Sequence, residues 1–337
     1  MTLAKWTTAA GTWLLAALMA IPAWSAEVGS NQRTAMPGTL NYVEGEASMN
    51  GEGLNAKSVG VADLQNGDVL ETGNGKAEIL LTPGVYLRLG SNSSVKMIST
   101  NLTNTQVALN RGEAMIEADE LFQQNDLQVS QPGADTHVLR TGLYDFDADH
   151  QAIRVFDGKA DVRADDHDIK VKKNHELELS SAKLKARGFQ KDQIAKNDDL
   201  YRWSSLRSEY LSEANVDEAQ RYYANGWYGP GWWGPGWYWD PWFSGFTFLP
   251  GSGFFYNPFG WGFYSPLMVW RAPYYGGIYG YHHFDGARPV AIGRGFHNHA
   301  VTAFHGGYGH IGAPVHAGGF GGMHGGGGFH GGGGVHR

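Results

Sequence analysis

Apolar and polar residues alternate with a period of two between residues 42 and 179. The alternating runs recur every 8 to 10 residues and are separated by turn-forming pairs such as Pro83-Gly84 and Asp157-Gly158. This pattern predicts an all-β fold, which we expect to be a single antiparallel β-sandwich or roll-like domain over residues 40–182. The repeating apolar positions are Ala77, Ile79, Leu81, Val85, Leu87 and Leu89, followed by Tyr144/Phe146, Ile153/Val155, Ala160/Val162, Ile169/Val171 and Leu177/Leu179.

After Ser180 the apolar residues take the spacing of a helix. They occupy one predicted face, made of Leu200, Trp203, Leu206, Tyr210 and Ala214. Asp198 and Asp199 suit the start of this helix, because an acidic side chain caps the first amides and opposes the helix dipole. We therefore expect a helical segment over residues 190–224, containing a short amphipathic helix that packs on the β domain.

The C-terminal third has no regular hydrophobic period. Residues 225–281 form an aromatic, Gly- and Pro-rich low-complexity segment that holds 8 of the 12 Trp residues. Gly and Pro there disfavour regular helix or central strand. Residues 282–337 are Gly- and His-rich and are expected to be a disordered tail.

The N-terminus has the features of a secretion signal over residues 1–26, followed by a linker at 27–39. Lys5 precedes an apolar run from Trp6 to Ile21, and Ala23-Trp24-Ser25 forms a small-x-small cleavage pattern. Cleavage after Ser25 is favoured, with cleavage after Ala26 or retention as an anchor as the alternatives. The run is shorter than the roughly 20 residues that span a bilayer. We expect a protein of the periplasm or outer cell envelope, with no membrane span after cleavage.

Charge is distributed unevenly along the chain. Residues 27–220 contain 31 acidic and 20 basic residues, whereas residues 221–337 contain 2 acidic and 5 basic ones. An acidic body argues against nucleic acid as a partner, because phosphate binding requires a clustered basic face. Cysteine is absent, which excludes disulfides, thiolate metal sites and cysteine nucleophiles.

A series of glycine-containing motifs runs through the β region. In chain order they are Asn66–Gly73 (NGDVLETG), Gly75–Ile79 (GKAEI), Leu87–Ser93 (LRLGSNS), Asn110–Glu113 (NRGE), Arg140–Tyr144 (RTGLY) and Val155–Val162 (VFDGKADV). In this order and spacing they resemble the FecR-like periplasmic domain family over roughly residues 40–180. RTGLY departs from the R-G-T-x-F of that family by exchanging Thr and Gly.

The resemblance implies a periplasmic β domain with a binding or regulatory role. The best-known members of the family relay a signal from an outer-membrane siderophore receptor to a sigma factor. They do so with a cytoplasmic anti-sigma arm, one membrane helix and a periplasmic FecR-like domain. Only five residues precede the apolar segment here, so we expect no cytoplasmic arm. The resembling residues are expected to form the fold, with the glycines of the motifs at turns.

Motifs that would indicate catalysis or a defined ligand are lacking. Gly73-Asn74-Gly75-Lys76 does not have phosphate-loop spacing and is expected to be a turn. Asp145-x-Asp147-x-Asp149 lacks the Gly and Glu of an EF-hand loop. We expect these three carboxylates on the solvent face of a strand, with a calcium site of another type as the alternative. No nucleophile, base and acid set stands out, so the chain is expected not to be an enzyme.

Ten of the 14 histidines lie in the last 56 residues. Neutral imidazoles on a flexible chain bind Zn²⁺, Ni²⁺ or Cu²⁺ weakly and with little selectivity. These candidate metal ligands are His282, His283, His297, His299, His305, His310, His316, His324, His330 and His336. No dedicated cofactor is expected.

These observations predict an exported, non-catalytic FecR-like envelope protein that acts as a binding, scaffold or regulatory module. Its partner is expected to be an envelope protein or a glycan, which the aromatic segment could contact by stacking. The alternatives are a metal-sequestering protein that uses its His/Gly-rich tail, and a signalling regulator that works through a membrane partner.

Overall fold

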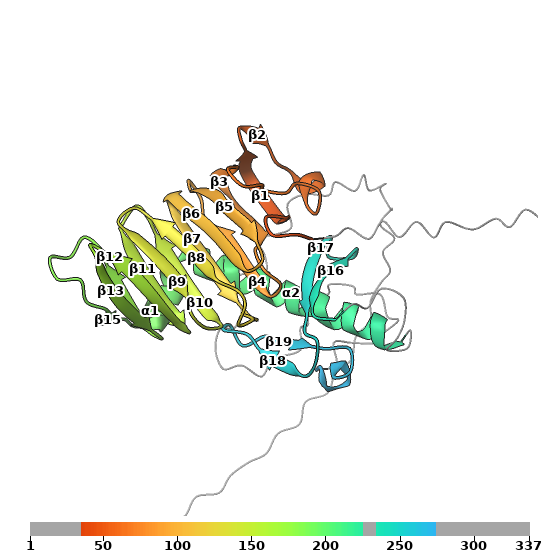
Figure 1. Ribbon diagram of the computed structural model, residues 1–337. Helices are drawn as coiled ribbons and strands as arrows, with labels where there is room; N and C mark the ends of the chain where they lie inside the picture. Colours follow the sequence, from red (N-terminus) through yellow and green to blue (C-terminus); the bar gives the residue numbers. More distant parts are fainter. Residues whose placement is uncertain (1–34, 225–233, 274–337) are drawn as a thin grey trace, which may run out of the picture. The chain divides into compact units, whose positions relative to one another are not determined.

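The computed structural model describes residues 35–224 and 234–273. The predicted signal sequence and the ten tail histidines lie outside these ranges. Fifteen strands belong to one sheet, shown in Figure 1. They are β1 (Leu40–Met49), β2 (Glu52–Gly53), β3 (Val69–Leu80), β4 (Val85–Leu89), β5 (Ser94–Asn101), β6 (Asn104–Arg111), β7 (Glu113–Ala118), β8 (Leu127–Gln131), β9 (Ala134–Val138), β10 (Gly142–Asp147), β11 (Ala152–Asp157), β12 (Lys159–Ala164), β13 (His167–Lys172), β14 (His175–Glu178) and β15 (Arg187–Gly188).

The sheet folds over on itself around one apolar core, which confirms the predicted all-β domain. Strand order runs β13-β12-β9-β8-β6-β5-β3-β4-β7-β10-β11-β14-β15, and the pairs along this order are antiparallel except β6 with β8. The long strand β3 pairs with β5 through its first residues and with β4 through its last ones. Val107 and Val162 from one half of the sheet share the core with Ile79 and Val155 from the other. The period-two pattern correctly identified Ile79, Val155 and Val162 as buried positions.

The glycines of the motifs do not all lie at turns. Pro83-Gly84 does join β3 to β4, with Gly84 at a φ of +83° that favours glycine. Gly73 and Gly75, in contrast, lie inside β3 at an irregularity of its pairing with β1. A Cβ on Gly75 would approach the Glu44 carbonyl oxygen to 2.5 Å. The expected turn at residues 73–76 is therefore wrong, and glycine is needed there because two strands approach closely.

Two helices follow the sheet: α1 (Lys191–Asn197) and α2 (Asp199–Ala224). Helix α2 packs against β4 and β7, on the face of that half of the sheet opposite the apolar core. Of the predicted apolar face, Leu200, Trp203 and Ala214 are buried, whereas Leu206 and Tyr210 are half-buried. Polar residues of α2 are buried as well, namely Ser204, Arg207, Ser208, Ser212, Asn215 and Glu218. No helix within residues 35–224 or 234–273 has the length and apolarity required to cross a membrane.

The aromatic segment forms two short hairpins rather than irregular chain alone. Strands β16 (Gly236–Asp240) and β17 (Gly245–Leu249) make one, and β18 (Phe254–Tyr256) and β19 (Gly262–Tyr264) make the other. A one-turn 3₁₀ helix, η2 (Val269–Arg271), follows. Each hairpin has two strands, so neither contains the central strand that Gly and Pro were expected to disfavour, and these residues fall mainly in the connections between strands. The side chains of Phe246, Phe248 and Phe263 are completely buried against Leu80, Tyr86 and Leu211.

Candidate functional site

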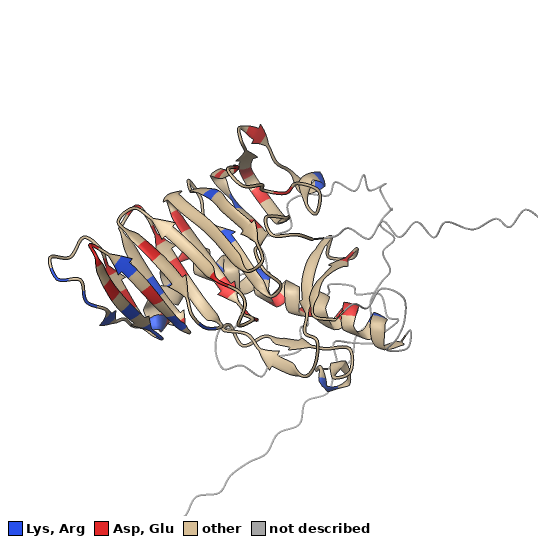
Figure 2. Cartoon of the chain, viewed as in Figure 1, with Lys and Arg blue, Asp and Glu red and all other residues tan. Residues whose placement is uncertain are grey.

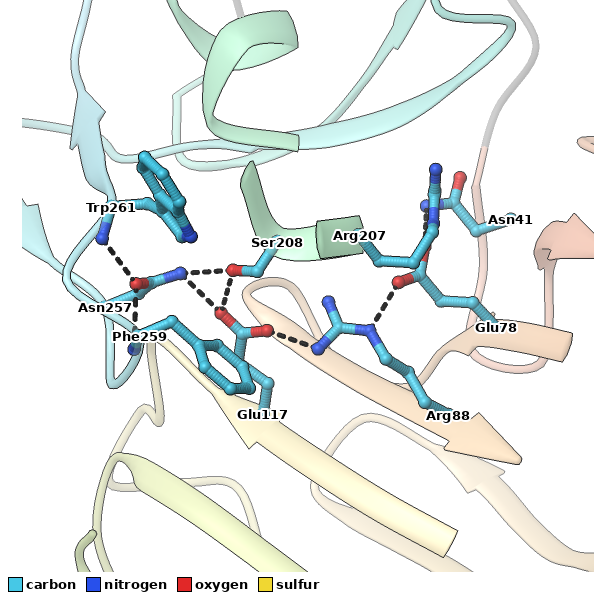
Figure 3. A network of polar contacts seen from close by, with 9 residues as sticks. All are labelled: Asn41, Glu78, Arg88, Glu117, Arg207, Ser208, Asn257, Phe259 and Trp261. Atoms are coloured by element: carbon cyan, nitrogen blue, oxygen red, sulfur yellow. Dashed lines mark hydrogen bonds and ion pairs between the residues drawn. The ribbon is translucent and has the colours of Figure 1, made fainter. Parts of the chain in front are cut away.

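A buried ion network lies where α2 covers the sheet. Arg88 on β4 has no exposed surface, and its guanidinium lies between two carboxylates. Its Nε donates to Glu78 Oε2 of β3 at 2.7 Å, and its Nη1 donates to Glu117 Oε2 of β7 at 2.5 Å. Both carboxylates are also completely buried. Three neighbouring strands therefore carry one continuous charged row on the face turned toward α2 (Figure 3).

Helix α2 and the second hairpin complete this network. Arg207 Nη2 donates to Glu78 Oε1 at 2.9 Å, and the Ser208 hydroxyl donates to Glu117 Oε1 at 2.7 Å. Asn257, in the connection between β18 and β19, donates from Nδ2 to the same Glu117 oxygen at 2.6 Å. Figure 3 shows these side chains converging from three segments far apart in the sequence.

The network is balanced in charge, with two guanidinium groups facing two carboxylates. Burial alone would raise the pKa of Glu78, but Arg207 and Arg88 outweigh this effect and hold the pKa below its usual value. Burial would likewise lower the pKa of Arg88, yet the carboxylates of Glu117 and Glu78 raise it. Glu78 and Arg88 therefore stay ionised and paired with each other. We interpret this network as a device that fixes the helix to the sheet.

The side-chain amides of two buried asparagines form hydrogen bonds with the backbone of the hairpins. Asn41 of β1 accepts from the Phe246 amide at 2.7 Å and donates to the Phe246 carbonyl oxygen at 3.0 Å. Asn215 of α2 accepts from the Tyr264 amide at 2.8 Å and donates to the carbonyl oxygens of Phe248 and Tyr264 at 2.9 and 3.1 Å. A primary amide satisfies backbone donors and acceptors at once, as a neighbouring strand would.

A second cluster of carboxylates is not balanced in charge. It consists of Glu113 at the start of β7, Asp145 on β10 and Asp198 just before α2. Each contributes one carboxylate oxygen, and these three oxygens lie within 4.8 Å of one another. Burial, together with the nearby carboxylates of Asp145 and Asp198, raises the pKa of Glu113 to about 9. Burial also raises the pKa of Asp145 to about 7, although Arg154 opposes this. We call these three residues the carboxylate cluster.

The expected solvent exposure of the Asp145 motif is corrected by the structure. Asp145 is completely buried and Asp147 nearly so, whereas Asp149 is exposed. Asp145 Oδ2 accepts from Arg154 Nη1 at 2.7 Å, and Asp147 Oδ1 accepts from the His150 amide at 2.9 Å. The alternation of this strand was assigned correctly, but its second face is covered by other parts of the chain rather than by water.

An exposed aromatic surface lies on β18 and η2. Tyr256 is 63% exposed and Trp270 is 65% exposed, and Phe254 lies edge-on to Tyr256 with ring centroids 6.0 Å apart. The guanidinium of Arg271 lies 5.6 Å from the Phe254 ring and 5.1 Å from the Trp270 ring. The surroundings carry little other charge (Figure 2), since Asp240 and Arg271 are the charged residues within 234–273. We call Phe254, Tyr256, Trp270 and Arg271 the aromatic surface.

The described surface also has a hollow of about 440 Å³ over β1 and β3, which is wide open to solvent. It is lined by backbone and small side chains together with Glu46, Glu71 and Arg111. Such a depression lacks the enclosure and the convergent polar groups of a typical small-molecule site. We therefore place the candidate functional surfaces at the carboxylate cluster and the aromatic surface.

A buried carboxyl near the end of α2 makes the stability of the fold depend on pH. Burial raises the pKa of Glu218 to about 8, an effect that Arg221 opposes. The folded-state pKa lies above the ordinary value of 4.5, so the contribution of this group to stability is full below that value and is lost as the pH rises toward 8. We expect Glu218→Gln to be more stable than the parent at pH 9 by on the order of 2–4 kcal/mol. The difference should nearly vanish at pH 4, as measured by urea unfolding at each pH.

The matched control for this pH dependence is Glu52→Gln, because Glu52 is an exposed residue of β2. Its unfolding free energy should follow that of the parent across the pH range. If the Glu218→Gln and parent curves ran parallel from pH 4 to pH 9, the ionisation of Glu218 would not be coupled to folding.

Sequence reasoning missed the residues that the structure brings together. Glu78 and Arg88 alternate with the predicted apolar positions of their strands, and the sequence analysis gave them no role. A usable signal was present, because three adjacent strands carry charged residues on one face and α2 carries polar residues at helical spacing. The predicted ligands in the tail, from His282 to His336, lie outside the described residues and stay a prediction.

Comparison with known proteins places part of the chain in a family. No match was found among curated proteins. Two crystal structures, each described as a candidate anti-sigma factor from Parabacteroides distasonis, match at 15% identity with TM-scores of 0.34 and 0.33. Each match covers 38% of this chain and 62% of the solved chain, so this chain spans less than two thirds of their length. The model of the FecR protein family matches residues 68–161, from just before β3 into β12. The chain therefore carries a FecR-family region over residues 68–161.

Proposed function

We propose that this protein is an exported, non-catalytic FecR-like module of the cell envelope that binds a glycan through its aromatic surface. The observation that carries the proposal is the exposure of Tyr256, on the hairpin whose backbone Asn215 binds, and of Trp270 in η2 directly after it. Large exposed aromatic rings beside a cation are typical of binding surfaces. The match to the FecR family supports a regulatory role for the module.

The chemistry of the surface favours a glycan over an apolar partner. The ring faces of Tyr256 and Trp270 are suited to stacking against the C–H faces of sugar rings. Arg271 adds a guanidinium, which pairs with carboxylates in bidentate geometry. A polymer that combines sugar rings with carboxylate groups matches both features, and peptidoglycan is the envelope polymer of that kind.

The charged groups inside the fold support a non-catalytic role. Glu78, Arg88 and Glu117 are completely buried and paired with one another, so they are not offered to a substrate. The FecR family is regulatory, which agrees with this interpretation. Metal sequestration by the tail and signalling through a membrane partner stay as alternative proposals. The first depends on tail residues outside the described ranges, and the second depends on another protein.

Binding to isolated peptidoglycan sacculi tests the proposal. We expect the full-length protein to sediment with sacculi, and Tyr256→Ala combined with Trp270→Ala to weaken this binding at least about tenfold, since each stacked ring contributes on the order of 1 kcal/mol. The matched control is Trp242→Ala, because Trp242 is 63% exposed but lies in the turn between β16 and β17. Equal loss in the control, or no sedimentation of the parent, would contradict the proposal. Thermal melts of all variants should agree within a few degrees.

A further inference from the structure

We propose that Glu113, Asp145 and Asp198 form a calcium-binding site that joins the start of helix α2 to the sheet. The three residues come from separate segments: Glu113 opens β7, Asp145 lies on the neighbouring strand β10, and Asp198 immediately precedes α2. A cation held among them would link two strands and a helix terminus at one point.

An unsatisfied atom inside the cluster points to a ligand. Asp145 has no exposed surface, and its Oδ1 has no hydrogen-bond partner, while Oδ2 accepts from Arg154. A buried carboxylate oxygen left without a donor is costly in free energy. Asp198 likewise commits only one oxygen, since its Oδ1 accepts from the Tyr201 amide at 2.8 Å. Both residues therefore retain an oxygen that a cation could take.

The charge of the cluster requires compensation. Three carboxylates meet here, and the nearby cation Arg154 is shared, because its Nε also lies 3.5 Å from Glu176 Oε2. Asp147 adds a further negative charge close by. With all three carboxyl groups ionised, one shared guanidinium would leave about two negative charges at a largely buried place, so the cluster either holds protons or binds a divalent cation.

The size of the cluster fits calcium. Its oxygen atoms all lie within 4.8 Å of one another. This limit is no more than twice a Ca–O distance of roughly 2.4 Å, so one Ca²⁺ ion can contact all three carboxylates. Magnesium requires a near-octahedral shell and gives up its water ligands reluctantly. Calcium accepts irregular sets of carboxylate, carbonyl and water oxygens. Neither ion prefers imidazole, so the predicted tail histidines do not compete for it.

Calcium titration of the full-length protein tests the proposal. After treatment with EGTA, 1 mM Ca²⁺ should raise the melting temperature by roughly 4–8 °C, and excess EGTA should reverse the rise. The same concentration of Mg²⁺ should produce less than half of it. Na⁺ at matched ionic strength should produce none.

The decisive variant is Glu113→Gln, because it removes one ligand charge without leaving an unpaired partner. We expect Ca²⁺ no longer to raise the melting temperature of this variant. Its melting temperature in EGTA should equal or exceed that of the parent, since repulsion within the cluster is relieved. Asp198→Asn should weaken calcium binding at least tenfold in titration calorimetry. The matched control is Asp168→Asn, because Asp168 is an exposed residue of β13; its calcium response should equal that of the parent.

Two results would overturn the proposal. One is an equal calcium-dependent rise in the melting temperature of Glu113→Gln, which would place the ion elsewhere on the acidic surface. The other is the absence of such a rise in the parent. If Glu113→Gln were then also more stable than the parent in EGTA, protons rather than a metal ion would compensate the carboxylates.

Discussion

Arg88→Met is expected to lower the free energy of unfolding by at least about 3–5 kcal/mol, enough to leave much of the protein unfolded. Methionine has a similar length and fits an apolar environment, so the loss should come from charge rather than from volume. In this variant Glu117 would keep its hydrogen bonds from Ser208 and Asn257 but would have no cation beside it. Because Glu117 has no exposed surface, water could not compensate its charge. Urea unfolding followed by tryptophan fluorescence measures the effect.

A compensating variant separates charge from packing. In Arg88→Met combined with Glu117→Gln, Glu78 remains paired with Arg207, and the neutral amide of residue 117 can still bond Ser208 and Asn257. We expect about half of the lost stability to return. The control Arg163→Met removes an exposed arginine of β12 and should cost less than about 0.5 kcal/mol. If the double variant were no more stable than Arg88→Met, the network would not act through charge balance.

Shortening the chain to end at residue 225 is expected to destabilise the whole β domain severely, whereas ending it at residue 273 should not. The hairpins between these points bury Phe246, Phe248 and Phe263 against Leu80 and Tyr86. Removal of the hairpins would expose this apolar surface, at roughly 1.5–3 kcal/mol for each large side chain. Asn41 and Asn215 would also lose their backbone partners. Calorimetry should show a melting temperature at least about 10 °C lower for the shorter chain.

The chain ending at residue 273 is the matched control for the shorter one, since both lack the same His-rich tail. Its melting temperature should stay within a few degrees of the parent. If both shortened chains melted together near the parent temperature, the hairpins would contribute nothing to the fold. Limited proteolysis of the full-length protein should likewise leave a fragment that includes residues 234–273.

The sequence pattern predicted one face of the sheet and not the other. Ile79 and Val155 were identified as buried because apolar side chains are stabilised by removal from water. Glu78 and Arg88 received no role, because a charged side chain is buried only when partners neutralise it. Arg88 has its partners on the neighbouring strands β3 and β7, and Arg207, the second partner of Glu78, lies on α2. Alternation within one strand carries no information about either contact. Asp145 was misplaced because its partner Arg154 lies on the adjacent strand β11.

The aromatic hairpins show a second limit of sequence patterns. Gly and Pro correctly indicated breaks in regular structure, but the strands between them have only three to five residues. Strands this short leave too few positions for a period to be recognised. Their stability depends on Asn41 and Asn215, which reach them from distant elements. The family resemblance, by contrast, was readable from local motifs, because turns and close strand contacts require glycine at particular positions.

The asparagine contacts have a consequence for how this protein can change over generations. The side-chain amides of Asn41 and Asn215 form hydrogen bonds with the backbone of Phe246, Phe248 and Tyr264. Every residue except proline provides the same backbone donor and acceptor. The outward-facing residues Tyr256 and Trp270 take no part in these contacts. Substitutions at the outward positions therefore leave the attachment of the hairpins intact. Related proteins can vary the exposed chemistry of this surface, and so the partner it recognises, while the body beneath it stays the same.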